Sequence, residues 1–200
     1  NVLDYMIPTN DPRISKYFDK PVDQANYVSV QTEEEASDIT AKISMYLYRA
    51  DAPEVVFSLQ EQLYFEAEAY ARGLGVAKDL AKANELYKKA TEEALKFNGI
   101  SAVDASTYAS TKLSNLTTSV KPLDDIHIAQ WIDLMDRPLD AFTQWRRSGT
   151  EGSEVPDLNL PDGAPSGPLM RRWLYSPDEE TANPNTPKGT KYTDKLWFDL

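Results

Sequence analysis

The chain has 200 residues, 41% of them hydrophobic, which is enough to enclose one sizeable core without requiring a second domain. Its 21 basic and 32 acidic residues give a formal net charge of −11, which argues against nucleic acid as a partner because a phosphate backbone requires a basic surface. The chain has no cysteine, so disulfides and thiolate metal sites are excluded. No apolar run approaches the roughly 18–20 residues that a membrane span needs.

The first part of the chain, residues 1–57, is predicted to be irregular or extended, with proline-containing turn signals. Within it, Ile43, Met45 and Leu47 alternate with Ser and Tyr, which is the period of a short strand. Residues 54–57 form a second candidate extended piece. This segment leads into the best-defined element of the sequence.

Residues 58–97 are predicted to form two antiparallel helices, over about 58–73 and 79–97. Ser58 and Glu61 form a capping box, Gly73 has the freedom to end the first helix, and Asp79 is an N-cap for the second. We expect Tyr70 and Tyr87 to be buried where the helices meet. The two apolar stripes comprise Leu59, Leu63, Ala67, Tyr70 and Leu74, and then Leu80, Ala83, Leu86, Tyr87, Ala90, Ala94 and Phe97.

Three more helices are predicted before the composition changes. They cover 104–116, 124–135 and a segment that begins at Pro138 and carries Leu139, Phe142 and Trp145 on one side. From 150 onward the chain is rich in proline, which is typical of a linker. Its large apolar side chains are costly to leave in water, so we expect this tail to pack on the folded body.

No catalytic residue and no metal ligand is assigned. Adjacent acids on helices are typical of a solvated face, and no motif places two of them across a cleft as glycoside hydrolysis requires. His127, the only histidine, lacks the companions of a zinc site. The acid pairs considered are Glu66 and Glu68, Asp124 and Asp125, and Glu179 and Glu180.

The aromatic residues suit sugars, because the apolar face of a pyranose stacks on a flat ring. The pattern nevertheless favours a core position for the four tryptophans, and it leaves Tyr46 and Tyr48 equally suited to a ligand and to covering the helices, so the glycan-binding residues stay unassigned. The tryptophans are Trp131, Trp145, Trp173 and Trp197.

Two arginine pairs sit where a helix or an aromatic step meets a loop. An arginine fork suits a carboxylate ligand, but the position favours an anchoring role. We therefore predict that at least one arginine of each pair bonds the tail to the helices through backbone carbonyls or acids. The pairs are Arg146 with Arg147, and Arg171 with Arg172.

Two resemblances follow from residues in order along the chain. The hairpin resembles a single tetratricopeptide or Sel1-type repeat through Ala67, Tyr70, Gly73, Gly75, Val76, Asp79, Ala83, Tyr87 and Ala90. Nearly the whole chain resembles the C-terminal half of SusD/RagB-like outer-membrane nutrient-binding lipoproteins. The carrying segments are 11–13, 46–53, 61–73, 130–132, 141–149, 171–177 and 195–199, including Trp145-Arg146-Arg147 and Lys195-Leu196-Trp197-Phe198-Asp199.

The SusD-like resemblance implies a mainly α fold of tetratricopeptide-like helical hairpins with long irregular loops, arranged as a SusD-like α-α superhelix. Residues 1–200 would then be the C-terminal part of a SusD-like domain. Within it, 1–57 would be the irregular or extended entry, 58–148 the helical part, and 149–200 the loop-rich tail packed on the helices.

The same resemblance implies cell-surface binding of a glycan, an oligosaccharide or starch-type nutrient, with no catalysis and no cofactor. The ligand would be delivered to a TonB-dependent, SusC-like transporter in the outer membrane. The lipid anchor would lie in an upstream segment missing from this chain. The alternative is a tetratricopeptide or Sel1-type adaptor that binds other proteins through its helical concavity.

Overall fold

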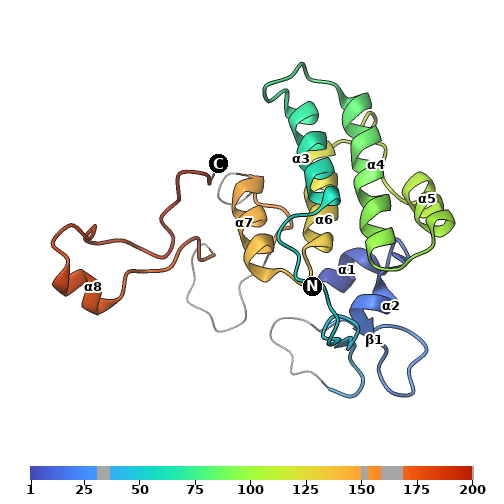
Figure 1. Cartoon of the computed structure of the whole chain (residues 1–200), viewed down its shortest axis with the longest axis horizontal. Coiled ribbons are helices and arrows are strands. Elements are labelled where there is room, and N and C mark those ends of the chain that lie inside the picture. The colour runs from blue at the N-terminus through green and yellow to red at the C-terminus, as the bar shows by residue number, and fades with distance from the viewer. Residues whose placement is uncertain (31–36, 150–152, 159–168, 200) are drawn as a thin grey trace. The chain divides into compact units, whose positions relative to one another are not determined.

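The structure is a computed structural model that describes residues 1–30, 37–149, 153–158 and 169–199 (Figure 1). Its described part is mainly helical, as predicted, with one two-stranded antiparallel pair. The chain forms two compact units, residues 1–141 and 142–200. In chain order the elements are α1 (Val2–Met6), α2 (Ile14–Tyr17), β1 (Phe18–Asp19), β2 (Lys42–Ile43), α3 (Leu59–Arg72), α4 (Leu80–Phe97), α5 (Ala102–Thr111), α6 (Pro122–Asp133), α7 (Pro138–Ser148) and α8 (Pro177–Ala182).

The predicted hairpin is confirmed as α3 and α4. The Ser58 hydroxyl accepts from the Glu61 amide at 3.3 Å, and the Glu61 carboxylate accepts from the Ser58 amide at 3.1 Å. Gly73 ends α3 in the left-handed region, with φ of 79°, where a side chain would be strained. The Asp79 carboxylate then accepts from the Lys82 amide at 2.9 Å and starts α4. Local chemistry alone therefore positions both ends of this turn.

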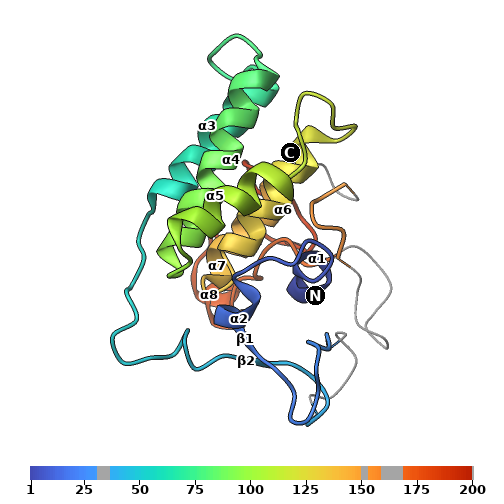
Figure 2. The same ribbon diagram turned by 90° about the vertical axis from the view of Figure 1, so that its right-hand side faces the viewer.

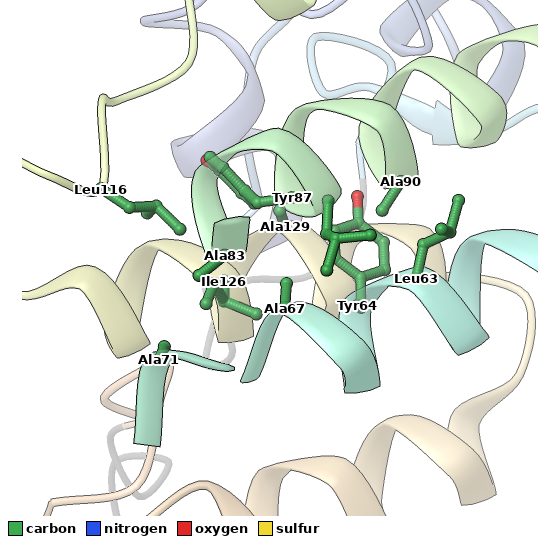
Figure 3. Packing of buried hydrophobic residues seen from close by; sticks show 11 residues of the cluster. Leu63, Tyr64, Ala67, Ala71, Ala83, Tyr87, Ala90, Leu116, Ile126 and Ala129 are labelled. Carbon is green, nitrogen blue, oxygen red and sulfur yellow. The ribbon is translucent and has the colours of Figure 1, made fainter. Parts of the chain in front are cut away.

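Small residues line the contact between α3 and α4, with Ala67, Ala83 and Ala90 fully buried. They let the two helix backbones approach closely, and α6 packs against both of them (Figure 2). Figure 3 shows Ile126 of α6 in the same cluster, which closes a three-helix core. The cluster comprises Leu63, Tyr64, Ala67, Ala71, Ala83, Leu86, Tyr87, Ala90, Leu116, Ile126 and Ala129.

The buried face of α3 is rotated from the predicted stripe. Tyr64 is fully buried, and its hydroxyl bonds to that of Thr91 at 2.9 Å, a pair that hydrophobic spacing does not reveal. The predicted stripe members at the ends of the hairpin, Leu59, Leu74 and Phe97, are exposed. Of the two tyrosines predicted to be buried, Tyr87 is buried, whereas Tyr70 is half-buried at the edge of the cluster.

The helices predicted at 104–116 and 124–135 are confirmed in kind as α5 and α6, but each begins two residues earlier than predicted, and they end at Thr111 and Asp133. For α5, the Ser101 hydroxyl accepts from the Asp104 amide at 3.1 Å, so the helix begins immediately after this cap. For α6, Pro122 occupies the first turn. Helix α7 begins at Pro138 as predicted, but Leu139 is exposed and only Trp145 of the predicted stripe is buried.

The N-terminal segment contains more regular structure than the sequence indicated. Helices α1 and α2 lie within residues 1–57, and the predicted strand is reduced to the two residues of β2. The strand prediction was wrong beyond Ile43, because the Ser44 hydroxyl accepts from the Tyr46 amide at 3.2 Å and bends the chain into a turn. No strand covers residues 54–57.

In the second unit, the predicted anchoring by arginine is confirmed. Arg146 Nη1 donates to the Arg171 carbonyl at 2.6 Å, and Arg171 Nη2 donates to the Arg146 carbonyl at 3.1 Å. Arg171 also pairs with Asp199 at 3.0 Å and with Glu154. One buried guanidinium thus ties three separate parts of the tail to the end of α7. The boundaries 1–57, 58–148 and 149–200, and the packing of the whole tail on the helices, stay predictions.

Two of the four tryptophans predicted to be core are exposed. Trp173 is 75% exposed and Trp197 is 94% exposed, so that prediction was wrong for both. Trp145 is buried and donates its indole N–H to the Pro156 carbonyl at 3.0 Å. Trp131 is half-buried and contacts Tyr5 edge-to-face with ring centroids 5.9 Å apart. Only the tryptophans on packed helices are covered.

Replacing Arg146 by alanine is expected to lower the free energy of unfolding by about 1–3 kcal/mol, because the Arg171 carbonyl loses its charged donor. Urea unfolding followed by tryptophan fluorescence measures the loss. Arg172→Ala is the matched control, since the described side-chain contacts of Arg172 are a 3.4 Å bond to the Trp173 carbonyl and a stacking contact with Tyr175. Equal stability of both variants would contradict the anchoring role.

Candidate functional site

The acid pairs considered from the sequence serve local structure. In each pair at least one carboxylate bonds within or beside its own helix, as expected for helix surfaces and caps. The bonds are Glu66 to Gln62 at 2.8 Å, Glu68 to Arg72 at 2.8 Å, Asp124 to Lys121 at 3.3 Å, Asp125 to Ser114 at 2.9 Å, and Glu179 to Asn183 at 2.6 Å.

His127 is fully buried in α6 and faces α3. Its Nε2 lies 3.3 Å from Arg72 Nη2 and 3.8 Å from a Glu68 carboxylate oxygen. Across the described part of the chain, no three His, Cys, Asp or Glu side chains gather as a metal site would require. His127 therefore packs α6 onto α3 in this structure.

The strongest candidate for a binding site is a cavity of about 400 Å³ in the first unit. It opens between the loop that follows β2, the end of α4 and the junction of α6 with α7, and its volume is in the usual range for ligand sites, about 300–1,000 Å³. Its lining residues are Ile43, Tyr46, Leu47, Tyr48, Arg49, Ala52, Pro53, Glu54, Phe97, Asn98, Met135, Asp136 and Pro138.

Tyr46 is held in place at the wall of this cavity. The Arg49 guanidinium lies over its ring at 4.2 Å and also donates to the Tyr46 carbonyl at 2.6 Å. The Lys16 ammonium lies 5.2 Å from the centre of the same ring. Two cationic side chains thus hold the aromatic ring and one hydrogen bond holds the backbone that carries it before any ligand arrives, which lowers the entropic cost of binding.

Two other rings of the cavity are open to solvent. Tyr48 is 67% exposed and Phe97 is 47% exposed, so each has an uncovered apolar surface. Large exposed aromatics beside a cavity are costly in water and are typical of binding sites. They provide surfaces on which a flat amphipathic ligand can stack.

Polar groups surround these rings. The carboxylates of Glu54 and Asp136 and the guanidinium of Arg49 lie in the wall, and Asn98 is held by its amide, which donates to the Ala94 carbonyl at 2.9 Å and to the Tyr17 hydroxyl at 3.2 Å. Acceptors and donors at the edge of a stacking surface match a ligand that carries hydroxyls around an apolar ring face.

The sequence contained part of this site. Tyr46 and Tyr48 were considered for a ligand and left unassigned, whereas Phe97 was placed on the helical stripe and Arg49 received no role. The useful signal was the segment 46–53, one of those that carry the SusD-like resemblance, because six of its eight residues line the cavity. No local pattern, however, brings this segment to the end of α4.

Comparison with known proteins identifies the family. Residues 1–175 match the SusD-like family described as starch-binding and associating with the outer membrane, and the chain belongs to this family. A solved structure of a chitin-binding protein is similar to this chain, with a TM-score of 0.76 and 24% identity. The match covers 100% of this chain and 49% of that one, so the chain spans about half the length of that structure. A search of curated proteins found no match.

Proposed function

We propose that the chain is part of a protein that binds a glycan without transforming it, and that the aromatic cavity beside α4 is a contact site for the sugar. The observation that carries the proposal is the pair of uncovered rings, Tyr48 and Phe97, beside the fixed ring of Tyr46. Family membership and the named ligand of the similar structure, chitin, support the same class of ligand.

Stacking and hydrogen bonding account for binding at such a site. The apolar face of a pyranose covers an exposed ring, while its hydroxyls exchange hydrogen bonds with Arg49, Glu54 and Asp136 at the edge. A partly open cavity leaves much of the sugar in water, so we expect affinities in the micromolar to millimolar range, about 4–8 kcal/mol. Captured sugars would thus be released readily.

Delivery to a transporter is the second part of the proposal. A SusD-like chain that captures a nutrient at the outer membrane would pass it to a TonB-dependent, SusC-like partner, with a lipid anchor holding the protein at the cell surface. The family description, which includes association with the outer membrane, supports this placement. No helix in the described part of the chain combines the length and the apolar character needed to cross a membrane.

Replacing Tyr48 by alanine is expected to weaken glycan binding about two- to tenfold, because one stacking contact is worth about 0.5–1.5 kcal/mol. Calorimetric titration with starch-derived and chitin-derived oligosaccharides measures the change. Tyr192→Ala is the matched control, since Tyr192 is also an exposed tyrosine and does not line the cavity.

Three results would contradict the proposal. Equal affinity of the Tyr48 and Tyr192 variants would remove the aromatic cavity from the binding site. Turnover of any oligosaccharide would show that the protein is an enzyme. Binding to a protein partner with no response to sugars would instead support the adaptor interpretation.

A further inference from the structure

A second hollow lies next to the aromatic cavity. It has a volume of about 590 Å³, is open to solvent, and follows the turn from α4 to α5. Its lining has no exposed aromatic ring, since its one aromatic residue, Tyr108, is buried, and its polar groups include several hydroxyls and two ammonium groups. The lining consists of Pro12, Ser15, Lys16, Gly99, Ile100, Ser101, Asp104, Thr107, Tyr108, Thr111 and Lys112.

The two hollows are neighbours at Lys16 and at the end of α4. Lys16 lines the second hollow while its ammonium lies 5.2 Å from the Tyr46 ring centre in the first. Phe97 and Asn98 line the first cavity, and the chain continues directly into Gly99 and Ile100, which line the second.

Gly99 leaves the backbone beside Lys16 without a side chain. A Cβ atom at Gly99 would have the Lys16 ammonium, 4.0 Å away, as its nearest neighbour, and the backbone there has φ of 75°. The residue therefore carries no side chain between the two hollows, and its conformation favours glycine. Lys16 thus reaches the Tyr46 ring of the first cavity from the second hollow that it lines, and the bare backbone of Gly99 lies beside its ammonium.

The second hollow offers both partners that sugar hydroxyls need. Thr107 donates its hydroxyl hydrogen to the Val103 carbonyl at 2.7 Å, and Thr111 donates to the Thr107 carbonyl at 2.7 Å. Their hydroxyl oxygens keep acceptor capacity for a ligand. The ammonium groups of Lys16 and Lys112 supply donors, and neither makes an ion pair with the described residues.

We infer that the ligand is a linear oligosaccharide that lies across both hollows, one part stacked on the rings of the first cavity and the next part hydrogen-bonded along α5. This inference rests on the proposed function. A single sugar occupies only the first cavity. Only a longer glycan also contacts the second hollow, so the second hollow raises the affinity for longer glycans.

The test compares short and long ligands of one sugar. Calorimetry is run on the whole chain with linear oligomers of glucose and of N-acetylglucosamine, from disaccharide to hexasaccharide. We expect the hexasaccharide to bind about tenfold more tightly than the disaccharide. The double variant Thr107→Ala with Lys112→Ala is expected to remove most of this gain in affinity and to leave disaccharide affinity unchanged. The reason is that both residues line the second hollow and neither lines the first cavity.

Lys89→Ala is the control, since Lys89 is exposed on α4 and lines neither hollow. A hexasaccharide that binds no better than the disaccharide, or a gain that the double variant retains, would overturn this inference. Disaccharide binding that still depends on Tyr48 would in that case leave the proposed function standing. Failure of every oligosaccharide to bind would overturn both.

Discussion

Replacing Arg13 by alanine is expected to lower the free energy of unfolding by about 3–5 kcal/mol, because it leaves a buried carboxylate without its charge partner. Arg13 and Asp11 are both almost fully buried. Arg13 Nε lies 3.0 Å from Asp11 Oδ1, and Nη2 lies 2.6 Å from Oδ2, which is the bidentate geometry of strong arginine–carboxylate pairs.

The same carboxylate holds the backbone around it. Asp11 Oδ1 accepts from the Arg13 amide at 2.9 Å, and Oδ2 accepts from the Tyr108 hydroxyl of α5 at 3.3 Å. The pair therefore fixes the turn before α2 and connects it to α5. A charge left unpaired at this position disturbs both contacts.

Urea unfolding of Arg13→Ala and of a control variant measures the loss of stability. The control is Lys82→Ala, which removes an ion pair of 3.0 Å with Glu85 at the surface and should cost at most about 1 kcal/mol. The double variant Asp11→Asn with Arg13→Met is expected to lose less than Arg13→Ala alone, since it removes both charges. A loss for Arg13→Ala no larger than that of the control would contradict the role of the buried pair.

Asp133 is expected to make the protein less stable as the pH rises from about 4 to 7. Burial raises the pKa of this carboxyl from 3.8 to about 7; the nearby positive charges of Arg13 and Arg137 lower it in part, while Glu61 and Asp136 raise it. Its Oδ2 has no hydrogen-bond partner among the described residues, so no hydrogen bond compensates that oxygen when the group ionises.

The direction follows from proton linkage. The folded state holds the Asp133 proton more tightly than the unfolded state, so the stabilising contribution is fully present below pH 3.8 and is lost as the pH passes about 7. A shift of about three pKa units corresponds to at most about 4 kcal/mol. Asp133→Asn cannot ionise, so the variant should lack this decline and should exceed the natural chain in stability at about pH 8.

Chemical unfolding of both proteins at a series of pH values between about 4 and 8 tests this expectation. Asp136→Asn serves as the control, because Asp136 is an exposed carboxyl close in sequence and its replacement should change the slope much less. Parallel stability curves for the natural chain and Asp133→Asn would contradict the raised pKa of Asp133.

The residues of the proposed binding site lie at the surface of the first unit, whereas these charged residues are buried in its interior. The aromatic cavity uses residues that hydrogen bonds and cation–ring contacts hold at the surface, such as Tyr46 and Arg49. The buried Asp11–Arg13 pair fixes the start of α2, the helix that carries Lys16. Loss of Arg13 should therefore also weaken binding of long glycans by loosening the junction between the two hollows.

The sequence by itself determined the elements whose ends depend on local chemistry. Ser58, Gly73 and Asp79 act on backbone groups within a few residues of themselves, so the α3–α4 hairpin could be predicted almost to the residue. Arginines placed beside loops likewise predicted the anchoring of the tail, because a buried carbonyl needs a donor.

Only the tertiary structure decided which faces are buried and where the cavity lies. Periodicity places Tyr64 and Phe97 on a helix but does not say which neighbour covers them: α4 and α6 bury the first, and the second is left beside Tyr46 and Tyr48. A segment at 46–53 reaches the end of α4 through long-range packing, in which the free energy of burial depends on contacts between residues far apart in sequence. Secondary-structure propensity does not include such long-range contacts, yet these contacts create the candidate site.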